Sequence, residues 1–166
     1  MVRNPIEQSL SAYFENFAHF RKRITGDADD PKTVFSHFLA DYPHAIALTW
    51  FDRELRDQIG IDVYKEPFDH DTRYAWLPDQ NTLIMRADCP DERKSAVLSE
   101  IFDTEITVTR RNEGHEKASG PLYAKVKSLA AYDHGFLDKM LENRFTRHFW
   151  SETELQEARR QLSCGQ

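Results

Sequence analysis

Hydrophobic and polar residues alternate along this chain at two different spacings, and the spacings predict its secondary structure. Between residues 4 and 24 the apolar side chains recur every three or four positions, which is typical of one helix face. Asn4-Pro5 opens this segment, and Asp30-Pro31 opens a second one of the same kind. A capping residue followed by proline marks a helix N-terminus. The pattern therefore predicts two N-terminal helices, over 4–24 and 30–42.

A strict alternation with a period of two predicts strands in the middle of the chain. The stretch 73–111 indicates strand, tight turn, strand, helix and strand, with turn residues PDQN at 78–81. The TEITVTR sequence at 104–110 is rich in β-branched residues, which favour strands. The stretch 122–132 is ambiguous, because its alternation favours a strand whereas its alanines favour a helix. The predicted strands are 44–51, 61–64, 73–77, 82–87, 104–110 and the first half of 122–132.

Four further helices are predicted from capping and stop signals. A short one starts after Asp52 and stops at Gly60, and another occupies 88–102 with Val97, Leu98, Ile101 and Phe102 on its inner face. A third spans 133–143. The last begins at a Ser151-Glu-Thr-Glu154 capping box, with Trp150 and Leu155 placed as a hydrophobic staple.

These elements predict an α+β fold. We expect a single domain over residues 1–166, in which a mostly antiparallel sheet of four to five strands is covered by N- and C-terminal helices. The hairpin at 73–88 and the strand at 104–110 would lie near the centre of that sheet.

Composition limits the classes of function. The hydrophobic fraction of 40% and the 11 Phe, 6 Tyr and 3 Trp predict a folded chain. A net charge of −6 makes nucleic acid an unlikely partner, because such binding relies on an excess of Lys and Arg. Two cysteines and no apolar run of membrane-spanning length predict a cytoplasmic protein without a membrane partner.

One candidate binding surface combines basic and aromatic residues just before the last helix. Trp, Tyr and Arg dominate the energetics of protein interfaces, so this run could bind another protein. The simpler interpretation is that its aromatic residues anchor the last helix to the core. The candidate residues are Arg144, Phe145, Arg147, Phe149 and Trp150.

A second candidate is an anion site around the loop at 112–121. Arg86, Arg110, Arg111 and Lys117 could together bind an anionic ligand, although a plain surface loop explains the same charges. In an enzyme, His115 or Glu105 would transfer the proton.

No sequence motif points to a metal or a cofactor. Asp69, His70 and Asp71 are consecutive, which is the wrong spacing for side chains that converge on one ion. Cys89 precedes a helix N-terminus, where a thiol pKa can fall, but it is more simply a small capping or semi-buried residue. We therefore expect no metal and no cofactor.

Two hypotheses for function follow. The first, slightly favoured, is a small cytoplasmic regulatory or inhibitory protein that acts by binding another protein, through an exposed apolar patch within 144–150. The alternative is a small cofactor-independent enzyme, of the lyase or isomerase type, acting on an anionic metabolite. A homo-oligomer stays open under both.

Overall fold

The computed structural model describes residues 1–109 and 119–163, and in these residues the fold is mostly helical. One antiparallel sheet of two strands is present there, so the predicted sheet of four to five strands is wrong. The strands are β1 (Tyr74–Leu77) and β2 (Thr82–Met85), joined by the 3₁₀ turn η2 (Pro78–Gln80). The helices are α1 (Pro5–Glu15), α2 (Phe17–Arg21), α3 (Pro31–Asp41), α4 (Ala45–Trp50), the π-helix η1 (Phe51–Arg56), α5 (Asp57–Ile59), α6 (Asp91–Phe102), α7 (Gly120–Leu129), α8 (His134–Leu141), α9 (Arg144–Phe149) and α10 (Glu152–Leu162).

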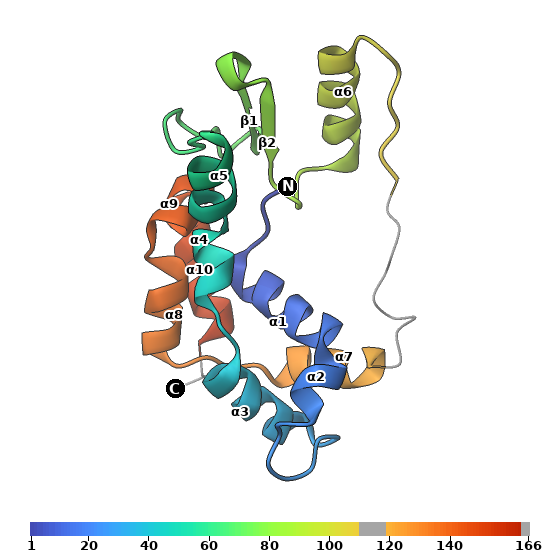
Figure 1. Ribbon diagram of the computed structural model, residues 1–166, viewed down its shortest axis with the longest axis vertical. Coiled ribbons are helices and arrows are strands. Elements are labelled where there is room, and N and C mark those ends of the chain that lie inside the picture. The colour runs from blue at the N-terminus through green and yellow to red at the C-terminus, as the bar shows by residue number, and fades with distance from the viewer. Residues whose placement is uncertain (110–118, 164–166) are drawn as a thin grey trace.

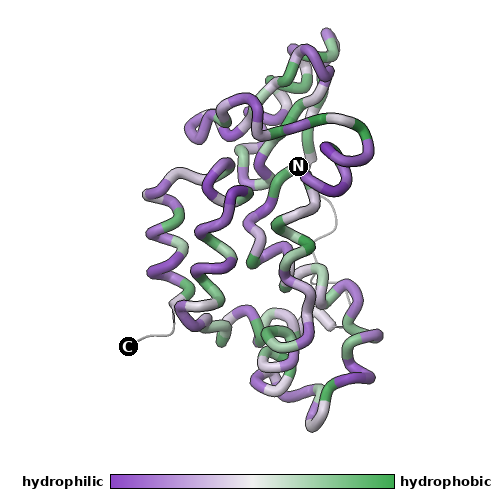
Figure 2. Tube along the Cα trace, turned by 60° about the vertical axis from the view of Figure 1, so that its left-hand side comes forward, coloured by the Kyte–Doolittle hydropathy of each residue, from purple (hydrophilic) through white to green (hydrophobic). Residues whose placement is uncertain are grey.

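The helices form one body, with the hairpin at its upper end and α6 set apart beside it (Figure 1). Helix α1 runs through the middle, α2, α3 and α7 lie at the lower end, and α8 and α10 lie along one side. Figure 2 shows hydrophobic and hydrophilic positions recurring along the helices at helical intervals. One side of each helix is therefore available for the core.

The main core is rich in aromatic side chains. Tyr13 is fully buried, stacks on Phe20 with ring centroids 4.7 Å apart, and places its hydroxyl 3.0 Å from His37 Nδ1. Phe149 is equally buried at the other end of the core. A smaller cluster of Met85, Cys89 and Val97 joins the hairpin to α6.

The predicted strand at 44–51 is wrong, because this segment is helix α4. Ala47 and Phe51, four residues apart, are buried on one helical face. Ile46 and Trp50, two of the large apolar residues whose alternation suggested the strand, are nearly half exposed. The helix continues through Asp52 as η1, so Asp52 does not cap it, whereas Gly60 ends it with a left-handed φ of 76° as predicted.

The predicted strand at 104–110 is also wrong, within the residues that the structure describes. The segment up to Thr109 is extended, but it lies against α6 instead of another strand. The backbone N–H of Ile106 donates to Ser99 Oγ at 2.8 Å and that of Val108 donates to Ser95 Oγ at 3.0 Å. Two serines one helical turn apart thus bind alternate residues of the extended segment, which satisfies backbone groups that a neighbouring strand would otherwise bind.

Two further boundaries differ from the prediction. Residues 122–129 belong to α7, so the strand predicted for the first half of 122–132 is wrong and the helical alternative is correct. The first helix is interrupted at Asn16, which lies between α1 and α2 and whose side chain donates to the carbonyl of Ala12. The predicted helices that open at Pro5, Pro31 and Ser151 are confirmed at those residues.

The cap of α10 gives a first test of the fold. Ser151 and Glu154 form the predicted capping box. We expect Ser151→Ala to lower the free energy of unfolding by about 1 kcal/mol, because the Glu154 amide loses its acceptor. Urea denaturation measures the change. Ser128→Ala, on an exposed serine of α7, is the matched control, and an equal loss in both variants would contradict the role of the cap.

Candidate functional site

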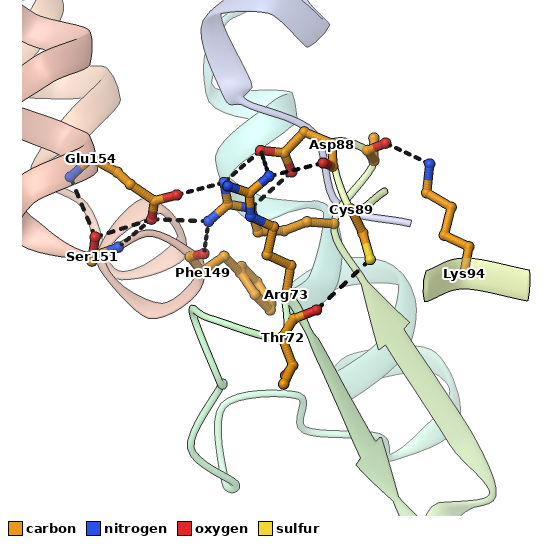
Figure 3. A network of polar contacts seen from close by, with 10 residues as sticks. Thr72, Arg73, Asp88, Cys89, Lys94, Phe149, Ser151 and Glu154 are labelled. Atoms are coloured by element: carbon orange, nitrogen blue, oxygen red, sulfur yellow. Dashed lines mark hydrogen bonds and ion pairs between the residues drawn. The ribbon is translucent and has the colours of Figure 1, made fainter. Parts of the chain in front are cut away.

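Arg86 follows β2 directly, and its guanidinium is held by hydrogen bonds to two separate parts of the chain. Asp88 and Glu154 approach its guanidinium from opposite sides (Figure 3). Asp88 accepts from Nε at 2.9 Å and from Nη2 at 2.6 Å, and Glu154 accepts from Nη1 at 3.0 Å and from Nη2 at 2.8 Å. The Phe149 carbonyl accepts a fifth hydrogen bond at 3.2 Å. A guanidinium has five N–H donors, so all of them are used.

Burial and charge act against each other at this site. Arg86 is 2% exposed, and it lies 4.9 Å from the ring centroid of Trp150. Burial by itself would lower the pKa of Arg86, but its hydrogen bonds to Asp88 and Glu154 raise it above the ordinary value. Burial likewise tends to raise the pKa of Glu154, whereas Arg86 and Ser151 lower it overall. The three groups therefore stay charged together.

This placement corrects the expectation that Arg86 binds an anionic ligand. Its donors are occupied by the protein, and they connect the end of the hairpin to the start of α10. Glu105 is exposed on the extended segment after α6. The other members of that candidate site, Arg110, Arg111, His115 and Lys117, lie outside the described residues.

The expected exposed patch at 144–150 is not found. Phe145, Phe149 and Trp150 are buried in the main core, which is the simpler of the two interpretations of that sequence. Arg147 is exposed. Arg144 is exposed too, with its guanidinium 4.0 Å from the centroid of the Tyr64 ring and 3.9 Å from the Asp62 carboxylate.

The consecutive Asp69, His70 and Asp71 have structural contacts of their own. Asp69 Oδ1 accepts from the backbone N–H groups of Asp71 and Thr72, and His70 Nε2 lies 3.1 Å from the His148 carbonyl. Across the described part of the chain, no three ligating side chains group so that they could hold a metal ion.

Cys89 is not poised as a nucleophile. Its side chain is buried, free and directed at the Thr72 carbonyl, 3.7 Å away. Burial raises the pKa of the thiol despite the nearby Lys94, so it is protonated at neutral pH.

An apolar groove lies between the hairpin and α6, and we call it the hairpin groove. Its volume is about 770 Å³. The apolar walls comprise Trp76, Leu83, Met85, Leu98, Ile101 and Phe102. Pockets of this size with mostly apolar walls are typical of binding sites.

The hairpin creates this groove because its two faces pack against different parts of the molecule. Trp76 pairs with Leu83, and Tyr74 with Met85, so these four side chains share the face toward α6. Leu77 and Ile84 lie on the opposite face and are buried in the main core. The face with Trp76 and Leu83 is only partly covered by α6, and its uncovered part forms the groove.

The edge of the hairpin groove carries an exposed aromatic side chain and few charges. Phe102, predicted on the inner face of its helix, is 62% exposed. Lys94 is buried below it, where its ammonium donates to the Ala87 carbonyl at 2.9 Å and to Asp91 at 2.8 Å. Arg3 also lines the groove, and it forms no ion pair with a carboxylate of the described residues.

Few features of the sequence point to the hairpin groove. The prediction correctly placed three residues of the groove, Trp76, Leu83 and Met85, on strands. Whether one or both faces of a hairpin are covered depends on the helix that packs against it, and the strand pattern does not reveal that helix. Phe102 carried a usable signal, because it is the last apolar residue before Asp103, whose left-handed φ of 47° ends the helix.

Comparisons with protein-family models, with curated proteins and with solved structures found no match to this chain. Among the described residues, no helix combines the length and the apolar character needed to cross a bilayer.

Proposed function

We propose that this protein acts by binding another protein, and that the hairpin groove receives an apolar segment of that partner. The observation that carries the proposal is an apolar groove of about 770 Å³ whose edge exposes Phe102 by 62%. Large aromatic side chains that stay in solvent beside an apolar cavity are typical of interaction sites.

The charges beside the groove indicate which apolar segment fits it. Asp91 neutralises Lys94, whereas Arg3 has no carboxylate partner in the described part of the chain. A partner segment with an acidic residue beside its apolar side chains would pair with Arg3. The cytoplasm is the compartment we propose, supported by the free thiol of Cys89.

Site-specific photocrosslinking tests the proposal with a matched control. A benzophenone side chain at Phe102 should capture a defined partner, whereas the same group at Ile59 should not. The two positions are 62% and 60% exposed, and Ile59 lies outside the groove. Capture of the same proteins at both positions would contradict the proposal.

The partner so identified allows a quantitative prediction. We expect Phe102→Asp to weaken its affinity about 30-fold, because loss of an aromatic anchor at an interface typically costs about 2 kcal/mol. Ile59→Asp should change the affinity less than twofold. Titration calorimetry measures both, and unchanged binding by the Phe102 variant would place the interface elsewhere.

A further inference from the structure

A pair of histidines fastens a long irregular loop to helix α9. The loop runs from Ile61 to Arg73, between α5 and β1. His70 Nε2 lies 3.1 Å from the backbone carbonyl of His148. The His148 ring in turn packs edge-on against Tyr64, with centroids 5.1 Å apart. We call His70 and His148 the histidine clamp.

The clamp lies among charged groups of both signs. From the loop, Asp62 and Asp69 lie near the histidines, and from α9 Arg144 reaches over the Tyr64 ring. Burial lowers the pKa of His148, and the nearby Arg144 and His70 lower it further. Asp62 and the backbone of Val63 act in the opposite direction, and the net pKa is lowered.

The sign of the proton linkage follows from this lowered pKa. When the loop lies on α9, His148 binds a proton less readily than a solvated imidazole, whose pKa is about 6.5. With the loop released, His148 on α9 therefore binds a proton more readily below that pH, and acid favours release. A protonated His148 would also be repelled by the nearby Arg144 guanidinium.

From this geometry, we propose that the histidine clamp makes attachment of the loop to α9 sensitive to mild acid, in the range below about pH 6.5. The loop also forms one wall of a second pocket, of about 560 Å³, which lies along β1 and includes Lys65, Asp69, Trp76 and Asp79. Acid would thus remodel the surface beside the hairpin. This inference is independent of the function proposed for the hairpin groove.

Hydrogen exchange, corrected for the intrinsic pH dependence of the rates, tests the clamp. Between pH 7.5 and 5.5 we expect amides of residues 61–73 to lose roughly tenfold in protection, while those of α1 keep theirs. The His148→Phe variant keeps an aromatic ring but cannot titrate. In this variant the protection factors of residues 61–73 should differ by no more than about twofold between the two pH values. His134→Phe, on an exposed residue of α8, is the control and should behave like the wild type.

Two results would overturn the inference. One is a loss of loop protection in acid that persists in His148→Phe, because the titrating group would then lie elsewhere, for example at buried His44. The other comes from the unaltered protein, by NMR titration of its histidines. A His148 pKa at or above the solvated value of about 6.5 would remove the driving force whether or not the variant folds.

Discussion

Replacing Arg86 by alanine is expected to lower the free energy of unfolding by about 3 kcal/mol. The change removes five hydrogen bonds and leaves Glu154 and the Phe149 carbonyl without their partner. Loss of one member of a buried ion pair typically costs about 3–5 kcal/mol. Asp88 and Glu154 are partly exposed and can be rehydrated, which places our expectation at the low end of that range.

Two variants separate the geometry of Arg86 from its charge. Arg86→Lys keeps the charge but cannot form two bidentate pairs, so we expect an intermediate loss. Arg23→Ala removes an exposed arginine that lies 3.7 Å from Asp41, and such surface pairs contribute at most about 1 kcal/mol. Urea denaturation at pH 7 compares the three variants. Equal stability of Arg86→Ala and Arg23→Ala would contradict the conclusion that Arg86 stabilises the contact between the hairpin and α10.

The Arg86 prediction also has a pH signature. Glu154 has a pKa below its ordinary value of 4.5 in the folded protein, mainly through Arg86 against the opposing effect of burial. A lowered carboxyl pKa stabilises the fold above the unfolded pKa and loses that effect as pH falls through the folded pKa. The difference in the free energy of unfolding between the wild type and Arg86→Ala should therefore become smaller below about pH 4.5. If this difference in stability stayed constant in acid, the ion pairs of Arg86 would not contribute to the stability of the fold.

The elements that could be predicted from the sequence are those with local chemical signals. Pro31 and Ser151 mark helix starts through contacts within three or four residues, and Asn81 adopts the left-handed φ of 46° that its turn requires. Each of these signals acts within one turn of chain. They specify an element without any knowledge of what it packs against.

The strands at 44–51 and 104–110 were wrong because alternation reports which residues are apolar, not what covers them. The buried pair is Ala47 of α4 and Phe51 at the start of η1, and a small alanine gave too weak a signal against Ile46 and Trp50. The β-branched residues of 104–109 favour an extended backbone, but this segment does not join a sheet. Its partners are serine hydroxyls of α6, which no pattern in the segment itself could indicate.

The candidate site was hidden for the same reason. Arg86 is 68 residues from Glu154, so the ion pair that occupies it depends on the packing of α10 against the hairpin. The hairpin groove depends on how completely α6 covers one hairpin face. Packing between distant segments therefore determines that Arg86 cannot bind a ligand. It also determines that the apolar surface of the hairpin groove stays open.

Replacing Phe149 by alanine is expected to lower the free energy of unfolding by about 3–5 kcal/mol, the usual cost of removing a buried phenyl ring. Phe149 has no exposed surface. Its ring contacts Phe51, Phe68 and Phe145, with centroids 5.5, 5.1 and 5.3 Å away. The cavity would lie where α9, η1 and the loop 61–73 meet, so none of these elements could fill it alone.

Phe102→Ala is the matched control, since it removes the same ring from an exposed position. We expect it to change stability by less than about 1 kcal/mol while weakening binding to the partner captured at the hairpin groove. Phe149→Ala should show the opposite behaviour, with a large loss of stability and unchanged affinity in the fraction that stays folded. Thermal unfolding and calorimetry of both variants would therefore separate core from interface. If Phe149→Ala instead kept its stability and lost the partner, the binding surface would lie at 144–150, as the sequence alone had suggested, and the hairpin groove would lose its role.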